Sequence, residues 1–327
     1  MTNTKKNSIF GKLLTILLAL ALSMSMTVSA FGETVNGYET YLPEETIVEP
    51  PINIAPKLLT MPKRPTVQGK SAIVYCADTG QILYSKNRNT VQYPYSMTKL
   101  LTALVAVENN PDLEKVVTLT YYKPEKDETL VGFRTGEQVR IIDLLHAALI
   151  PSGNDAAYHL AIATSGSVKK FAALMNQKAK EIGATHSNFV NASGMHKKAH
   201  YSTAYDIMLI TKAALSNPTI RQIAGKEKYY MPKTNKHKKR KIYTTDSFLV
   251  KDSYKKYGVF GGKTGTWSWG KCCLTTGAFI DGHTYYTVVM GTSIPERYND
   301  TVKILKYGYK KVAYNEQQME LQQTEAE

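Results

Sequence analysis

The sequence predicts an α+β domain in which strands from the two ends of the folded chain share one sheet. Strand patterns occur between residues 72 and 84, helical patterns dominate residues 96–182, and strand patterns return between residues 262 and 291. The chain has 327 residues, enough for one large domain or two small ones, and we find no internal repeat.

The first thirty residues are typical of an export signal. Lys5, Lys6 and Lys12 precede a mostly apolar run over residues 13–28, and Val28-Ser29-Ala30 offers the small residues that a signal peptidase recognises. Because the apolar run is short for a membrane span, we expect cleavage rather than retention as an anchor. We therefore assign residues 1–30 to a signal peptide and expect an exported protein at the cell wall or membrane surface.

The positive charge of the chain indicates anionic partners outside the cell. The formal net charge is +14, and six basic residues fall within the segment Lys233–Lys241. Most charge runs are solvated loops, and this is our first interpretation; the alternative is a contact with an anionic wall polymer. Export removes nucleic acid and ATP as ordinary partners.

Residues 31–68 are predicted to form a linker, because they contain six prolines and five acidic residues. The folded domain is expected over residues 69–313. It begins with a hairpin in which Asp78-Thr79-Gly80 forms the turn between two strand-like segments.

Apolar spacing predicts the remaining elements. Helices are expected over residues 96–107, 135–150, 156–163, 168–182 and 301–312, and strands over residues 262–267, 271–280 and 283–291. The Gln- and Glu-rich residues 314–327 are predicted to be disordered.

The three cysteines argue against a disulfide framework, because their number is small and odd. Cys272 and Cys273 are adjacent and should point to opposite faces of a strand, where we expect small buried side chains. Cys76 lies at the end of the first predicted strand. No Cys/His spacing is typical of a metal site, so we expect neither a metal nor a cofactor.

A serine three residues before a lysine can pair a nucleophile with a base on one helix face. The pattern occurs four times, at Ser96/Lys99, Ser167/Lys170, Ser253/Lys256 and Ser268/Lys271. Only the first precedes a helix that is apolar nearly all round, which places its N-terminus at the mouth of a core. Ser167 is interpreted as the cap of a surface helix.

Two further segments are ordinary when taken alone. The segment Pro151–Asp155 suits a turn between helices. The segment Gly261–Trp267 ends like a phosphate-binding loop, but Tyr257 stands where that motif needs its first glycine.

Together, Ser96-Met-Thr-Lys99, Ser152-Gly-Asn154 and Lys263-Thr-Gly265 resemble the motifs of penicillin-recognising serine enzymes, above all the D-alanyl-D-alanine carboxypeptidases. The likeness covers about residues 70 to 312 and includes the segments 150–156, 171–176 and 200–204. It implies a β-lactamase/transpeptidase-like fold, with an antiparallel sheet flanked by helices, a helical subdomain and an active site between the two.

The resemblance also implies a role for each motif residue. Ser96 would be the nucleophile, Lys99 its base, Ser152 a proton donor to the leaving D-alanine and Asn154 a positioning residue. The substrate carboxylate would be bound by a second set of residues: Lys263, Thr264, Gly265, Thr266 and Arg297. Backbone N–H groups of Ser96 and Thr266 would form the oxyanion hole.

The implied activity is removal of the terminal D-alanine from peptidoglycan stem peptides through an acyl-enzyme, with β-lactams as covalent inhibitors. One alternative is a class A-like β-lactamase, which needs a glutamate for deacylation; the surroundings of Glu181 do not resemble that loop. Another is a non-catalytic wall-binding protein, against which the three intact motifs argue.

The sequence departs from the family in two places. Many members carry a C-terminal β-domain and a membrane-anchoring helix, which the segment after residue 313 does not resemble. Trp267 and Trp269 follow the Lys263-Thr-Gly265 motif in place of the usual residues. We expect the two indoles either at the rim of the pocket or packed on the domain.

Overall fold

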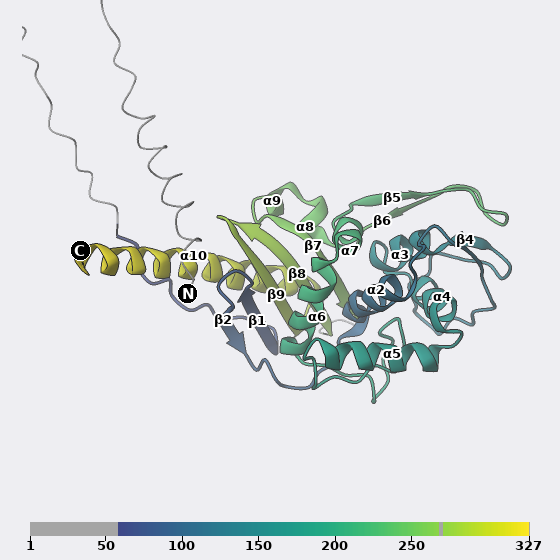
Figure 1. The fold of residues 1–327 in the computed structure, drawn as a ribbon, viewed down its shortest axis with the longest axis horizontal. Coiled ribbons are helices and arrows are strands. Elements are labelled where there is room, and N and C mark those ends of the chain that lie inside the picture. Colours follow the sequence, from purple (N-terminus) through teal and green to yellow (C-terminus); the bar gives the residue numbers. More distant parts are fainter. Residues whose placement is uncertain (1–57, 268–270, 327) are drawn as a thin grey trace, which may run out of the picture. The chain divides into compact units, whose positions relative to one another are not determined.

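A five-stranded antiparallel sheet lies at the centre of the fold (Figure 1), and its strand order is β2-β1-β9-β8-β7. The computed structural model describes residues 58–267 and 271–326. The strands are β1 (Ser71–Cys76), β2 (Gln81–Lys86), β7 (Val259–Thr266), β8 (Cys272–Ile280) and β9 (His283–Thr292). Strands from the two ends of the domain therefore share one sheet, as the sequence predicts.

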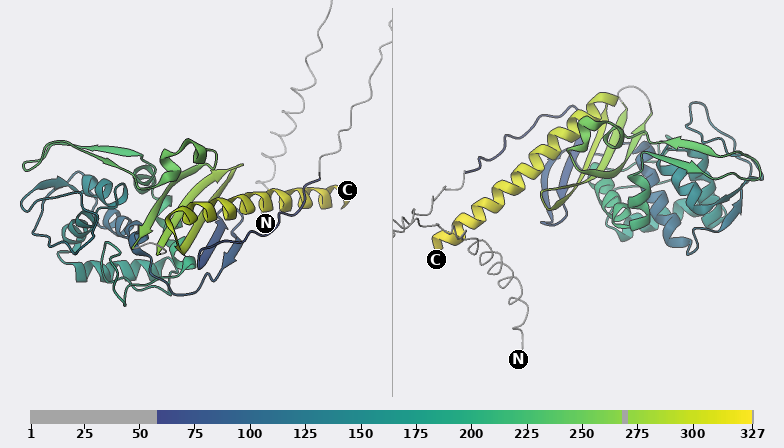
Figure 2. Two further views of the ribbon diagram at one scale, coloured as in Figure 1. Left: turned by 180° about the vertical axis from the view of Figure 1, so that it is seen from behind. Right: turned by 90° about the horizontal axis from the view of Figure 1, so that it is seen from above.

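Two apolar cores cover the two faces of the sheet, because side chains alternate along each strand. On β9, Val288 belongs to the core on the side of α2 and α6, whereas Val289 belongs to the core beneath α10. Figure 2 shows α10 (Ile294–Ala326) crossing one face of the sheet.

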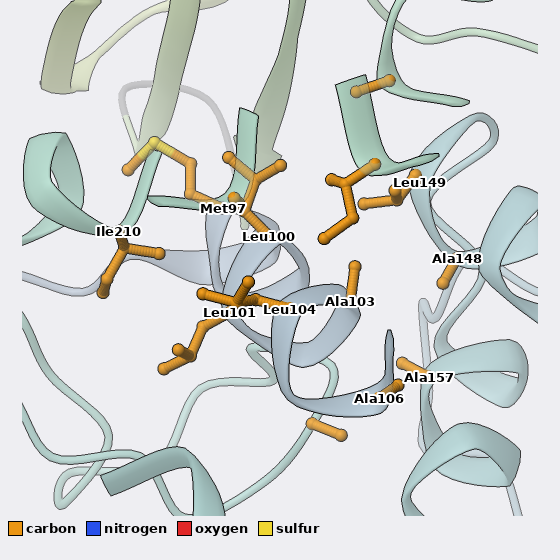
Figure 3. Close-up of a cluster of buried hydrophobic side chains, with 14 of the residues drawn as sticks. Met97, Leu100, Leu101, Ala103, Leu104, Ala106, Ala148, Leu149, Ala157 and Ile210 are labelled. Carbon is orange, nitrogen blue, oxygen red and sulfur yellow. The ribbon is translucent and has the colours of Figure 1, made fainter. Parts of the chain in front are cut away.

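The helical subdomain is built around α2 (Thr98–Asn109), which follows the 3-10 turn η1 (Tyr95–Met97). Apolar side chains point from α2 in several directions, toward Leu149, Ala157 and Ile210 on neighbouring helices (Figure 3). The helix is therefore buried nearly all round, as its sequence predicts. Its neighbours are α3 (Ile141–Leu149), α4 (Asn154–Ser165), α5 (Val168–Glu181), α6 (Ala204–Ser216) and α7 (Pro218–Ala224).

The predicted helix over residues 135–150 begins later than expected. Gly136 has a φ of 76°, and β4 (Gln138–Arg140) pairs with β3 (Val116–Thr118) before α3 starts at Ile141. The left-handed turn at Gly136 and this strand pairing prevent the helix from extending back to residue 135.

The basic segment Lys233–Lys241 belongs to a hairpin that the sequence did not predict. Its strands are β5 (Lys228–Met231) and β6 (Arg240–Tyr243), and the hairpin reaches beyond α3 and α7 in Figure 1. Two short helices, α8 (Ser247–Val250) and α9 (Asp252–Lys255), lead from it to β7.

The structure contradicts the predicted disorder of the C-terminal tail, since α10 continues to Ala326. Residues 314–326 consist mostly of Ala, Gln, Glu, Leu and Met, which favour helix even where net polarity is high. Two contacts hold this part of the helix to the domain: Leu59 N donates to Gln317 Oε1 at 2.6 Å, and Glu316 pairs with His283. Residue 313 is therefore not a structural boundary.

The predicted signal peptide and residues 31–57 of the predicted linker lie outside the described residues. Residues 58–70 form neither helix nor strand. Among the described residues, no helix combines the length and apolar character needed to cross a membrane.

Candidate active site

Ser96 lies in η1, directly before the buried helix α2. Its neighbour Tyr95 has a φ of 49°, a backbone conformation that residues other than glycine rarely adopt. Ser96 is half-buried and reaches the surface at the N-terminal end of α2. The sequence placed it at the start of this helix; the structure places it two residues before α2 begins, in the strained segment.

The amine of Lys99 lies beside the Ser96 hydroxyl, with 3.0 Å between Nζ and Oγ. Nζ also donates to Asn154 Oδ1 and to the Ser193 carbonyl oxygen, each at 2.7 Å. These two oxygens only accept hydrogen bonds. A neutral amine has two N–H groups and one lone pair, so the two oxygens use both N–H groups and leave the lone pair for Ser96.

The surroundings of Lys99 favour that neutral form. Burial lowers the pKa of Lys99 well below its ordinary value, and the Lys263 ammonium lowers it further. Glu128 and Asp155 act in the opposite direction. The Asp155 carboxylate accepts the backbone N–H of Gly132 at 2.9 Å, so it is already engaged by the loop beside the site.

Ser152 and Asn154 come from the turn between α3 and α4. A side chain at Gly153 would place its Cβ 2.7 Å from Val131 Cγ2 and 2.9 Å from the Ala147 carbonyl oxygen. The turn is therefore tight, and Ser152 has a φ of 67°, a second strained residue in this region. Asn154 opens α4 and is buried against Lys99.

Lys263, Thr264 and Gly265 lie on β7, the edge strand of the sheet. A Cβ at Gly265 would lie 2.9 Å from the Pro94 carbonyl oxygen and 3.2 Å from Tyr95 Cβ. The resemblance places this glycine in the set that would bind the substrate carboxylate. The structure adds that it allows β7 to pack directly against the turn that carries Ser96.

Lys263 is buried, and its Nζ donates to the Thr264 carbonyl oxygen at 3.1 Å. Burial lowers its pKa to about 7, with Arg297 acting in the same direction and Asp246 opposing both. Asp246 is itself buried and caps α8 by accepting the Phe248 N–H at 3.0 Å. Sequence reasoning missed Asp246, since nothing in its local sequence distinguishes it from an ordinary helix cap.

Arg297, in the first turn of α10, reaches the same end of β7. Its Nη1 donates to Thr266 Oγ1 at 2.9 Å and lies 3.4 Å from the Gly265 carbonyl oxygen. The structure thus brings Arg297 together with the other predicted residues, in contact with Thr266. Thr264 Oγ1 lies 2.6 Å from Thr245 Oγ1, which sequence reasoning also missed.

A cleft of about 470 Å³ opens over these groups. Its lining includes Ser96, Asn154 and Thr266. The Trp267 ring stacks on Tyr95 at its edge, with centroids 6.4 Å apart and planes 12° apart. Trp267 therefore lies at the rim, one of the two expected positions, whereas Trp269 lies outside the described residues.

His200 is buried beneath α2. Its Nδ1 accepts the Val190 N–H at 3.2 Å, so Nε2 carries the proton that it donates to Thr98 Oγ1 at 2.9 Å. Burial lowers the pKa of His200 to about 4, which keeps the ring neutral. It supports the first turn of α2, directly below the Ser96 turn.

The sequence model of the D-alanyl-D-alanine carboxypeptidase family matches residues 59–294. The chain belongs to this family. It is 33% identical over 248 residues to the carboxypeptidase DacF of Bacillus subtilis, covering 74% of this chain and 62% of that protein. It is also 33% identical over 270 residues to the carboxypeptidase of Streptomyces sp. K15, covering 75% of this chain and 89% of that protein.

Solved structures confirm the predicted fold. The Streptomyces K15 DD-transpeptidase matches with a TM-score of 0.70 and 30% identity, over 76% of this chain and 99% of that chain. A D-alanyl-D-alanine carboxypeptidase from Mycobacterium tuberculosis matches with a TM-score of 0.67 and 27% identity, over 78% and 94% of the two chains. The α+β architecture is therefore that of the serine DD-peptidases.

Within this family frame, Glu181 is remote from the site. It ends α5 and pairs with Lys178 at 2.6 Å, with its side chain 45% exposed. It is not among the residues that line the cleft. The position agrees with the sequence argument against Glu181 as a deacylating base.

The electrostatic effect of Asp246 on Lys263 predicts a shift in the pH profile. The resemblance implies that charged Lys263 binds the substrate carboxylate, and its pKa of about 7 means that the charge is lost as pH rises through neutrality. In Asp246→Asn the anion that raises this pKa is gone, so the alkaline fall in kcat/KM should move down by about one pH unit or more. The measurement is kcat/KM against pH on a peptide ending in D-Ala-D-Ala.

Asparagine can still cap α8, so the fold should persist. Asp252→Asn, an exposed change in the neighbouring α9, is the matched control and should leave the profile in place. An unmoved alkaline limb in Asp246→Asn would show that Asp246 does not set the charge of Lys263.

Proposed function

We propose that this member of the family removes the terminal D-alanine from peptidoglycan stem peptides through an acyl-enzyme on Ser96. The single observation that carries the proposal is the buried Lys99 amine, 3.0 Å from Ser96 Oγ, with both of its N–H groups taken by Asn154 and Ser193. The predicted export signal places the reaction outside the cytoplasm, where the wall lies.

Substrate binding uses the free edge of β7. An extended peptide pairs with an edge strand through its backbone, which brings its C-terminal carboxylate toward the end of β7. Lys263 attracts that carboxylate, and the hydroxyls of Thr264 and Thr266 donate to it. Arg297 acts through Thr266, whose hydroxyl accepts its Nη1–H at 2.9 Å.

Acylation then follows from the position of the neutral amine. Ser96 Oγ attacks the carbonyl carbon of the penultimate D-alanine while Lys99 takes the hydroxyl proton. The backbone N–H groups of Ser96 and Thr266 stabilise the oxyanion. As the peptide bond breaks, Ser152 passes a proton to the departing amine, and D-alanine leaves.

Deacylation restores the enzyme. Water attacks the ester carbonyl, the peptide leaves as a carboxylic acid one residue shorter, and Ser96 regains its proton. β-Lactams acylate the same hydroxyl, and we expect slow release, because Glu181, the glutamate considered for deacylation, does not line the cleft.

A second acyl acceptor is the other candidate. The Streptomyces K15 structure that this chain resembles is described as a DD-transpeptidase. An amine that reaches the acyl-enzyme before water would give transfer rather than hydrolysis.

The test uses purified mature protein, a fluorescent penicillin and a D-Ala-D-Ala peptide, with and without glycine as acceptor. Wild type should label stably and release D-alanine, whereas Ser96→Ala should lose both signals by at least about a thousandfold. Ser253→Ala is the matched control, since Ser253 and Lys256 repeat the spacing on the exposed α9.

The other outcomes identify the other functions. Rapid penicillin turnover would identify a β-lactamase, and a peptide product that carries glycine would identify a transpeptidase. If the folded wild type shows neither penicillin labelling nor D-alanine release, the protein is a non-catalytic wall-binding protein. Labelling that persists in Ser96→Ala would place the nucleophile elsewhere.

The β5–β6 hairpin supports a contact with an anionic wall polymer. Lys233, Lys236, Lys238 and Lys239 are exposed at its end, whereas Arg240 is already paired with the buried Glu137. Four exposed cations on one projecting hairpin attract a polyanion, and the attraction weakens with salt.

The double variant Lys238→Gln/Lys239→Gln should elute from wall fragments carrying anionic polymer at lower salt than wild type. Lys169→Gln/Lys170→Gln removes the same charge from exposed positions on α5 and is the control. If the two variants elute at the same salt concentration, the hairpin is a solvated surface loop and not a binding site for the polymer.

A further inference from the structure

At the opposite end of the sheet from Ser96, three metal-ligating side chains meet. They are Cys76 at the end of β1, Asp78 in the following turn and His283 at the start of β9. One ligand atom from each lies within 4.8 Å of the other two. Along β9, the rise of about 3.3 Å per residue puts this cluster about 30 Å from the catalytic end of the strand.

The orientation of His283 leaves one ring nitrogen for a ligand. Its Nε2 lies 2.9 Å from Glu316 Oε1 of α10, so Nε2 carries the proton and donates it to the carboxylate. Nδ1 is buried, and no described residue supplies it with a hydrogen-bond partner. A carboxylate that fixes one nitrogen while the other nitrogen faces a metal is the usual arrangement around zinc-bound histidines.

A second unsatisfied polar atom lies at the same place. Tyr285 is fully buried, and its hydroxyl also lacks a partner among the described residues. It stands directly opposite Cys76 in the pairing of β1 with β9. Buried polar atoms without partners are rare, and two in one cluster indicate a missing ligand.

We propose that Cys76, Asp78 and His283 bind a zinc ion. A water molecule would occupy the fourth position and form a hydrogen bond with the hydroxyl of Tyr285. Thiolate, imidazole and carboxylate together suit zinc, whereas calcium and magnesium avoid sulfur. The thiolate and the carboxylate balance the double charge of the ion. Ligand atoms that lie about 2.0 to 2.3 Å from one tetrahedral ion are about 3.5 Å apart from each other. Side-chain movements of about an ångström would therefore bring the three ligand atoms to these distances.

The fold gives the ion a route from solvent, and the bound ion would link three elements of the fold. Asp78 is exposed, so the ion can reach the buried thiol from solvent. Once bound, it ties the β1–β2 turn to β9 and, through His283 and Glu316, to the C-terminal half of α10. The site is independent of the reaction at Ser96, and metal binding should stabilise the protein rather than change its chemistry.

The experiment titrates metal-free, full-length mature protein with Zn²⁺, and with Co²⁺ as a spectroscopic probe. Wild type should bind one ion per chain, raise its melting temperature and show a thiolate-to-cobalt charge-transfer band. Cys76→Ser should abolish that band. Glu316→Gln, which removes the carboxylate that orients His283, should weaken binding about 10- to 100-fold. D-alanine release should stay within about twofold in every variant.

Two control variants and a substitution of the exposed ligand Asp78 separate loss of the metal site from general effects on the protein. Cys273→Ser and His186→Gln change residues outside the cluster and should bind zinc as wild type does. Asp78 Oδ2 also accepts the Thr284 N–H at 2.6 Å, so the melting temperature of metal-free Asp78→Asn is measured too; an unchanged temperature assigns its loss of affinity to the missing ligand. The absence of saturable binding to the folded wild type would overturn the proposal. Binding that survives both Cys76→Ser and Asp78→Asn would also overturn it.

Discussion

A buried lysine whose pKa is held well below its ordinary value is the feature on which the proposed active site depends. Burial disfavours the charged ammonium of Lys99, and Lys263 disfavours it further. The amine nevertheless stays polar and needs partners, which the oxygens of Asn154 and Ser193 supply at 2.7 Å each. Because these partners fix the two N–H groups, the lone pair has one direction left, toward Ser96.

Three elements of the fold position the Lys99 amine and the Ser96 turn beside it. The apolar helix α2 buries it, the tight turn before α4 delivers Asn154, and the edge strand β7 closes on the Ser96 turn at Gly265. The second lysine is held in a different balance, since Asp246 raises its pKa while burial and Arg297 lower it. Lys99 also has a buried carboxylate nearby, but Asp155 already accepts the backbone N–H of Gly132, and the pKa of Lys99 stays well below its ordinary value.

The sequence could predict the parts of this site that local patterns encode. The spacing of Ser96 and Lys99 on an apolar helix identified the pair, and the resemblance to a family supplied Ser152, Asn154 and Lys263. It could not supply Asp246 or the carbonyl of Ser193, because their roles arise only when distant segments pack together. Likewise, Cys76 and His283 become neighbours only through the pairing of β1 with β9. The residues after 313 were predicted to be disordered because they are polar, although most of them have a high helix propensity.

The charge on Lys99 can be measured directly by NMR of protein labelled at the lysine side-chain Cε, with the Lys99 signal assigned from its loss in Lys99→Gln. The account predicts a signal that titrates well below the ordinary pKa of lysine and belongs to the neutral amine at pH 7. A Lys99 signal that remains that of a charged ammonium up to about pH 10 would contradict it.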